Sequence, residues 1–279
     1  MSPDLLAEDA NPGLEDSDNF KWNQVWRVSD YEPDRVVAVA YHMGAIASFD
    51  GWLYFGTINP PALPIAAHSS RYGFSEVSGN ELLDRLLVML GTLRGSIIVR
   101  GRTFGDPILL PEYQLVSGSP FLTVYNPAVG WLLRENNMGL TQGGFPRSGL
   151  NGLDNYWNSH IWSMATLNSS LLIGTLDWSA IYLNFLEAGI DADIADALPF
   201  LLPVQDLNGA DLFRFLAGIE VPEEVDSGGN NNPYTCGWNS MAVQGNEVFM
   251  SGFNPFNVPG AASNSPPPTG GWSISSVYY

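Results

Sequence analysis

The most constraining feature of this 279-residue chain is a short unit that occurs three times without a gap. The copies are IASFDGWLYFGTIN (46–59), MATLNSSLLIGTLD (164–177) and MAVQGNEVFMSGFN (241–254). The first two copies share four identical residues in fourteen positions, and most other positions hold side chains of the same kind. Recurrence of this type is the sequence signature of repeat architectures, so it limits the fold before any other property does.

Each copy predicts a β-hairpin. Its first arm alternates apolar and polar residues, and its second arm returns as a run of apolar, β-branched and aromatic side chains. The pairs Asp-Gly (50–51), Asn-Ser (168–169) and Gly-Asn (245–246) lie where a two-residue turn needs residues that tolerate left-handed backbone angles. Small residues near the end of the second arm allow close packing or a bulge.

The spacing of the copies predicts propeller blades. A weaker fourth copy, LGTLRGSIIVRG, covers 90–101, so the copies begin at positions 46, 90, 164 and 241. A four-stranded blade needs about 40–50 residues. The first interval therefore fits one blade, and the other two fit one blade with an insertion or contain a degenerate blade. We expect an all-β fold, a β-propeller of four to five short blades with helical insertions.

The rest of the chain is assigned around these blades. Residues 1–19 are acidic and interrupted by Pro and Gly, so they predict a linker or arm, and 20–279 predict a single propeller domain. Apolar residues with helical spacing predict insertions near 80–90, 178–202 and 209–218. The first of these overlaps the weak copy that begins at Leu90, so we expect a helix to run straight into the strand of that copy.

Two further strand predictions concern completion of the propeller. Residues 118–135 read as another hairpin that completes a blade. Residues 23–28 resemble an outer strand without a preceding partner, and we expect them to pair with 272–279 and close the ring.

The repeats resemble those of large, mostly uncharacterised bacterial β-propeller proteins, in which a W-x-M-A strand, a turn and an L-Y-V-G-T strand mark each blade. The resemblance is carried by IWSMA…LLIGT in 161–175 and by CGWNSMAV in 236–243. QVWRV (24–28) and GWLLRENNMG (130–139) also resemble that family's outer-strand and blade-joining phrases. In separate segments, this resemblance to the propeller repeat proteins covers about half of the chain. It implies a propeller fold and supplies no catalytic residue set.

Composition excludes several classes of partner. The formal net charge of −18 comes from a scarcity of Lys and Arg, which total 11 against 29 Asp and Glu. Phosphate backbones need Lys and Arg to displace counterions, so neither nucleic acid nor an anionic membrane is an expected partner. No apolar stretch approaches the ~18 residues of a membrane span. The first residues lack the regions of a signal peptide. The Lys-poor, Asn-, Ser- and Trp-rich composition nevertheless favours an extracellular or cell-surface protein.

Candidate ligand-binding residues come from the strand ends of the repeats. Asn59, Asp177 and Asn254 occupy the same repeat position, where a structural role in capping a turn or a strand end is the alternative. His160 and Asp177 are the positions at which the second copy differs from the other two. Trp178 and Trp238 lie near strand ends and suit either an aromatic-rimmed binding surface or the core between blades.

No residue pattern predicts a catalytic centre or a metal site. DLNGAD (206–211) has the oxygen density of a calcium loop but lacks the remaining ligands of the loop pattern, so calcium is retained only as an alternative cofactor. His42, His68 and His160 have no second ligand at metal spacing, and His68 is assigned to a loop. Cys236 has no basic neighbour and is expected to be a buried, inert thiol. Glu112, Glu135 and Asp106 could face a channel, although their spacing does not select them.

These observations lead to one expected function and one alternative. We expect a non-catalytic propeller that acts as a structural or binding module, with a protein partner, self-assembly or a glycan as its target. The alternative is a glycan-active hydrolase or lyase that uses a channel carboxylate.

Overall fold

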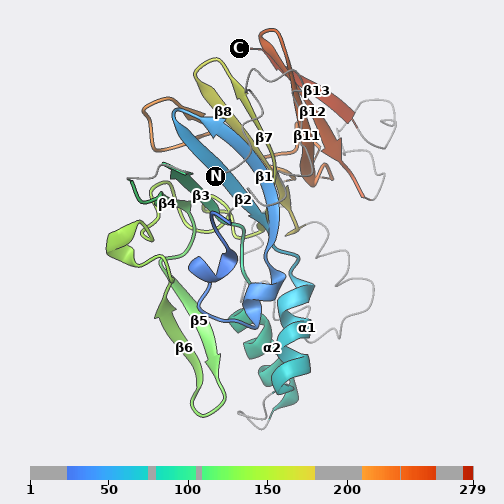
Figure 1. Cartoon of the computed structure of the whole chain (residues 1–279). Coiled ribbons are helices and arrows are strands. Elements are labelled where there is room, and N and C mark those ends of the chain that lie inside the picture. The colour runs from blue at the N-terminus through green and yellow to red at the C-terminus, as the bar shows by residue number, and fades with distance from the viewer. Residues whose placement is uncertain are drawn as a thin grey trace, which may run out of the picture.

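The computed structural model describes residues 24–74, 80–104, 109–179, 209–232, 234–255 and 273–278. Within these ranges the chain forms thirteen β-strands, two α-helices and three short 3-10 helices (Figure 1). The fold of the described residues is therefore mostly β, which confirms the expected all-β class at that level.

All three predicted hairpins form. They are β1 (His42–Phe49) with β2 (Trp52–Ile58), β7 (Asn158–Leu167) with β8 (Ser170–Asp177), and β11 (Gly237–Gln244) with β12 (Glu247–Phe253). At their turns, Asp50, Asn168 and Gly245 have φ angles of 48°, 54° and 61°. These left-handed angles are the ones that the turn residues of the repeat predict.

Each hairpin is extended sideways by further antiparallel strands. We call the extended hairpins unit 1 (built on β1 and β2), unit 2 (built on β7 and β8) and unit 3 (built on β11 and β12). In unit 1, β3 (Ile98–Arg102) and β4 (Glu112–Ser117) follow β2, and in unit 2, β9 (Leu212–Leu216) and β10 (Glu223–Asp226) follow β8. In unit 3, β13 (Ser273–Tyr278) pairs with β12. Among the described residues, the pairs Ile58↔His160 and Leu176↔Gly237 alone join the units into one eleven-stranded sheet.

The three units pack against one another through their sheet faces. One apolar cluster between units 1 and 2 contains Tyr54 and Ile98 on one side and Ile161, Ile173 and Phe213 on the other. A second cluster lies between units 2 and 3 and contains Leu172, Leu212, Trp238, Val248 and Met250. The middle unit is thus covered on both faces, as the row of units in Figure 1 shows.

The chain before β1 covers the other face of unit 1. This segment includes the 3-10 helices η2 (Val28–Asp30) and η3 (Val37–Ala40). Tyr31, Val37 and Tyr41 pack with Phe55 and Val99 of unit 1 in a third cluster. Residues 24–41 therefore cover β2 and β3 on this face and leave Met43 and Ile46 of β1 exposed.

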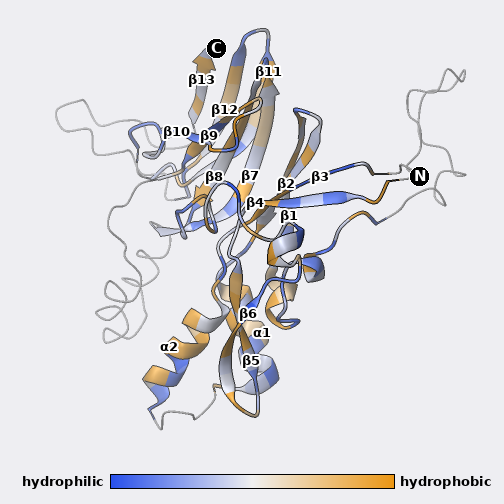
Figure 2. Cartoon of the chain, turned by 90° about the vertical axis from the view of Figure 1, so that its left-hand side faces the viewer, coloured by the Kyte–Doolittle hydropathy of each residue, from blue (hydrophilic) through white to orange (hydrophobic). Residues whose placement is uncertain are grey.

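Two helices and a hairpin lie at one end of unit 1 (Figure 2). They are α1 (Ala62–Tyr72), α2 (Glu81–Thr92), and β5 (Phe121–Asn126) paired with β6 (Gly130–Glu135) as a separate two-stranded sheet. A Cβ at Gly91 of α2 would lie 2.6 Å from the Trp131 ring, so glycine allows β6 to approach the helix closely. His68 of α1 stacks on the same ring, with centroids 5.0 Å apart.

The arrangement differs from the predicted closed propeller. The described sheets do not close on themselves, so a propeller is not confirmed. The predicted pairing of 23–28 with 272–279 is wrong, because residues 24–27 form no strand, η2 begins at Val28, and β13 pairs with β12 instead. The hairpin predicted in 118–135 forms, but it stands apart from the three units instead of completing a blade.

The helical insertions have three different outcomes. The helix near 80–90 is confirmed as α2. The insertion near 178–202 and the arm at 1–19 lie almost entirely outside the described residues. The prediction of a helix at 209–218 is wrong, since Leu212–Leu216 form the strand β9. Both faces of unit 2 are buried, so β9 carries apolar residues on both sides and loses the alternation that identifies a strand.

Two local assignments can be compared with the structure. The expected run of a helix into the strand of the weak copy at 90–101 is confirmed, because its first part ends α2 and its second part forms β3. His68 lies in α1 and not in a loop. Pro61 and Pro64 conceal this helix in the sequence, although proline is compatible with the first turn, where backbone N–H groups have no partner within the helix.

Candidate functional site

Four of the predicted site residues gather where units 1 and 2 meet. Asn59 follows β2, Asp177 ends β8, and His160 lies on β7 between these two strands. His160 pairs in register with Ile58, and the centroid of its ring is 6.0 Å from that of Trp178. The repeat therefore brings Asn59, His160, Asp177 and Trp178 together at one end of the sheet.

Burial gives Asn59 and His160 structural roles at this place. Asn59 is 2% exposed, and its Nδ2 donates to the carbonyl of Gly95 at 2.9 Å. The Nδ1 of His160 lies 2.8 Å from the hydroxyl of Ser159. Burial lowers the pKa of His160 to about 4, so its imidazole is neutral at pH 7.

Asp177 has a second buried carboxylate, Asp211, as its neighbour. The Nδ2 of Asn155 donates to Asp177 at 2.9 Å and to Asp211 at 3.0 Å, and Asn158 donates to Asp211 at 2.6 Å. Burial raises the pKa of Asp177, and it raises that of Asp211 to about 7 even though both amides oppose the shift. This pair can hold or release a proton near neutral pH.

Trp238 and Asn254 lie elsewhere. Trp238 is 1% exposed and belongs to the core between units 2 and 3, where its carbonyl accepts a hydrogen bond from Ser163 at 2.6 Å. Asn254 follows β12, at the repeat position of Asn59 and Asp177. Trp238 therefore has the core role that its sequence left as the alternative.

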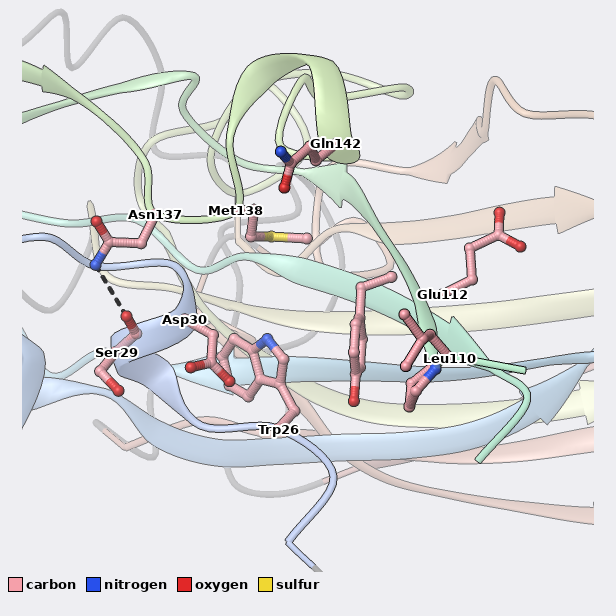
Figure 3. Close-up of a pocket in the computed structure, with 10 residues that line it drawn as sticks. Trp26, Ser29, Asp30, Leu110, Glu112, Asn137, Met138 and Gln142 are labelled. Carbon is pink, nitrogen blue, oxygen red and sulfur yellow. Dashed lines mark hydrogen bonds between the residues drawn. The ribbon is translucent and has the colours of Figure 1, made fainter. Parts of the chain in front are cut away.

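A groove of about 700 Å³ lies on the opposite side of unit 1, beside the segment that covers its face (Figure 3). Three stretches distant in the sequence form its walls: 26–30, the beginning of β4, and the loop that follows β6. The lining residues are Trp26, Ser29, Asp30, Leu110, Pro111, Glu112, Tyr113, Asn137, Met138 and Gln142.

The groove combines an apolar floor with a polar rim. Trp26, Tyr113 and Met138 pack against the buried cluster beneath them, and the rings of Trp26 and Phe55 are 5.2 Å apart. The hydroxyl of Tyr113 donates to the carbonyl of Val25, which ties β4 to the N-terminal segment. Burial, together with the charge of Asp30, raises the pKa of Tyr113, so the phenol stays neutral at pH 7.

The charged groups of the rim are balanced by arginines. Asp30 accepts a hydrogen bond from the guanidinium of Arg27 at 3.2 Å. Glu112 accepts one from Arg102 at 2.7 Å. Asn137 is held in place by donating to the carbonyl of Ser29 at 2.9 Å, which Figure 3 shows as a dashed line. The rim thus offers fixed hydrogen-bonding groups with little net charge.

The described residues provide neither a cluster of metal ligands nor an activated thiol. Among the described residues, no group of three or more His, Cys, Asp or Glu side chains could hold a metal ion. Of the calcium-like loop at 206–211, only Gly209, Ala210 and Asp211 are described. Cys236 is buried, as expected, and burial raises its thiol pKa to about 12. None of the described helices is long and apolar enough to cross a membrane.

Sequence reasoning missed most of the groove. Residues 24–28 and 130–139 were interpreted only as structural motifs of a propeller. Glu112 was named as a possible channel residue, but its spacing gave no reason to select it. Nothing in the sequence places Trp26, Tyr113 and Gln142 together, because the contacts between their segments span about 30 to 110 residues. Asp211 was considered only as the last residue of a calcium-like loop, and its place beside Asp177 was not predicted, because the strand that follows it was assigned to a helix.

Comparison with known proteins finds no matching family model, no matching curated protein and no matching solved structure. Function is therefore argued from the chain's own geometry. Two places have the necessary chemistry: the buried carboxylate pair of unit 2 and the groove beside unit 1.

Proposed function

We propose that this chain is a non-catalytic binding module whose groove takes a glycan. The observation that carries the proposal is the pairing of an aromatic and thioether floor with a rim of carboxylate and amide side chains. Ligand sites commonly combine apolar walls with a few fixed polar groups that set orientation. A sugar ring matches this division, because its C–H face is apolar and its hydroxyls both donate and accept hydrogen bonds.

Charge favours a neutral ligand over an anionic one. The chain has a formal net charge of −18, and the rim contributes the carboxylates of Asp30 and Glu112. The net negative charge of the chain would disfavour a phosphate or sulfate group. A neutral glycan meets only hydrogen-bonding partners, since Arg27 and Arg102 already occupy the two carboxylates.

The repeat and the composition support a setting for this module. The three units resemble blades of the bacterial propeller repeat proteins, and a closed propeller stays a prediction for the chain. The scarcity of Lys and the abundance of Asn, Ser and Trp support a place outside the cell or on its surface. In that setting the module would serve a larger structural assembly by holding a glycan.

A panel of neutral oligosaccharides tests the proposal. Isothermal titration calorimetry with α- and β-linked hexose and pentose oligomers should detect binding by the full chain. Replacing Trp26 by Leu should abolish the heat signal, because the aromatic floor is removed. Gln142→Ala should weaken binding about tenfold, as expected for one lost hydrogen bond.

A matched variant separates loss of the groove from loss of structure. Phe121 is a half-exposed aromatic residue on β5 that does not line the groove, so Phe121→Leu should bind as the native chain does. Circular dichroism should give the same spectrum for all three variants. The proposal fails if no oligomer binds, or if Trp26→Leu and Gln142→Ala both retain native affinity.

A second candidate function is glycan hydrolysis, and the carboxylate pair of Asp177 and Asp211 favours it. The two carboxylates share Asn155 as a donor, and the pKa of Asp211 is about 7, which suits a general acid. Their exposure of 2% and 4% argues against direct contact with a substrate and ranks this candidate second. Release of reducing sugar that disappears in Asp211→Asn would favour hydrolysis.

A further inference from the structure

Each contact between units uses the same two faces. We call the front face of a unit the side that carries Tyr54 and Ile98 in unit 1 and Leu172 and Leu212 in unit 2. The back face is the opposite side, with Ile161 and Ile173 in unit 2 and their counterparts in unit 3. The front of unit 1 packs on the back of unit 2, and the front of unit 2 packs on the back of unit 3.

A glycine and a large side chain mark both contacts at the same repeat position. A Cβ at Gly56 would lie 2.4 Å from the Cβ of Ile161, and a Cβ at Gly174 would lie 2.6 Å from that of Trp238. Ile161 and Trp238 occupy equivalent positions, each just before a register irregularity in the first strand of its unit. The two contacts are therefore repeats of one interface.

Unit 3 has the front face of this interface, and none of the units formed by the described residues packs on it. The position opposite the glycine is Ile98 in unit 1, Leu212 in unit 2 and Ile274 in unit 3. The first two are 0% and 1% exposed, whereas Ile274 is 63% exposed. Tyr278 on the same side is 79% exposed, and the glycine position is occupied by the small residue Ser251.

Unit 1 exposes, on its first strand β1, residues of the back face that would pack on such a front face. Met43 and Ile46 correspond to Ile161 and Met164 of unit 2, which pack against unit 1. Met43 is 53% exposed and Ile46 is 55% exposed, although residues 24–41 cover the strands beside them. Ile274 and Tyr278 thus mark an exposed part of a front face at one end of the row, and Met43 and Ile46 mark an exposed strip of a back face at the other end.

We propose that the chain associates head to tail with a second copy of itself, the front face of unit 3 packing on the β1 strip of the next copy. The occupant follows from the molecule, because among the described residues a back face with this residue pattern covers the front face at both internal contacts. Exposed apolar residues on a strand mark an interaction surface when they cluster. Contacts between two different patches are heterologous and build rings or filaments.

Sedimentation velocity of the full chain over a range of concentrations tests the association. The weight-average mass should rise with concentration. Ile274→Asp should remove the rise by blocking the front face, and Ile46→Asp should remove it by blocking the strip. Both residues are more than half exposed, so the variants should fold. Val129→Asp, at a 67% exposed apolar residue in the β5–β6 turn, should associate as the native chain does.

Mixing the two blocked variants tests the head-to-tail geometry. Ile274→Asp retains the strip and Ile46→Asp retains the front face, so an equimolar mixture should form a 1:1 complex and grow no further. A chain that stays monomeric at every concentration overturns the proposal. So does association in which Ile46→Asp still assembles alone, because a front-to-front dimer would then be the interface. This result is independent of the groove, which lies on residues outside both surfaces.

Discussion

The guanidinium of Arg94 lies 2.8 Å from the carboxylate of Glu32, and the two side chains are 3% and 0% exposed. Glu32 also accepts a hydrogen bond from the hydroxyl of Tyr41 at 3.0 Å, and Arg94 donates to the carbonyl of Thr123 at 2.6 Å. This buried pair joins the N-terminal segment to the connection between α2 and β3. It fixes the segment that forms one wall of the groove.

Removing one member of this pair should be strongly destabilising. Arg94→Met leaves the carboxylate of Glu32 buried without its counter-ion, so we expect a loss of about 3–5 kcal/mol of unfolding free energy in urea titrations. Arg85→Met is the control, because Arg85 and Glu81 form an exposed pair worth about 0.3–0.5 kcal/mol. Equal losses in the two variants would contradict a special role for the buried pair.

Asp211 should make stability depend on pH. Its pKa is about 7 in the folded chain and about 3.9 when unfolded, so the folded state binds more protons between these values. Its contribution is complete below about pH 4 and is lost as pH rises to about 7, by up to about 4 kcal/mol. The depressed pKa of His160 acts in the opposite direction between about pH 4 and 6.5, so a variant must be compared with the native chain.

The comparison uses Asp211→Asn, whose side-chain oxygen can still accept from Asn155 and Asn158. Its unfolding free energy relative to the native chain should increase steadily from pH 4 to pH 7. A constant difference for Asp211→Asn would mean that Asp211 does not titrate in this window.

An added methyl group at the glycine of the inter-unit contact should destabilise the fold. In Gly56→Ala the new Cβ would lie 2.4 Å from Ile161, and overpacking of this kind costs about 1–3 kcal/mol. Gly174→Ala should have a similar cost, because Trp238 lies equally close. At Gly228 the nearest atom is 4.0 Å away, so thermal unfolding of Gly228→Ala should resemble that of the native chain.

Arg100 should not tolerate lysine. Its guanidinium lies 4.5 Å from the centroid of the Trp52 ring and donates to Gln114 at 2.6 Å and to the hydroxyl of Tyr54 at 3.1 Å. A lysine ammonium cannot reproduce the planar stacking and the forked donors, so Arg100→Lys should cost about 1–2 kcal/mol in urea unfolding. Arg35→Lys, at an exposed residue, should change stability by less than about 0.5 kcal/mol.

Local chemistry made the hairpins predictable. The left-handed turn residue, such as Asn168, and the alternating arms on either side of it lie within about fourteen residues. The sequence of each copy is therefore enough to predict its hairpin. The positions of β3, β9 and β13 beside the hairpins depend on packing between units. Phe213 and Leu212 point to opposite sides of one strand, and only the covering units explain why both are apolar.

The candidate sites were predictable to a smaller extent. The repeat placed Asn59 and Asp177 at strand ends correctly, because equivalent residues end equivalent strands. Neither Asp211 nor Trp26 could be selected, since the partner of each comes from a different part of the chain. A groove formed by three separate segments has no sequence pattern of its own, and burial decides which polar residues remain available to a ligand.

The repeated glycine contact has a consequence for how such a chain can change over evolutionary time. Gly56 packs on Ile161 in the same way as Gly174 packs on Trp238. A gene duplication that copies a whole unit therefore also copies the front face and the back face through which units pack. Lengthening or shortening the row by one unit therefore needs no newly invented interface. Only the segment 24–41, which covers β2 and β3 of unit 1, would have to stay beside the first unit.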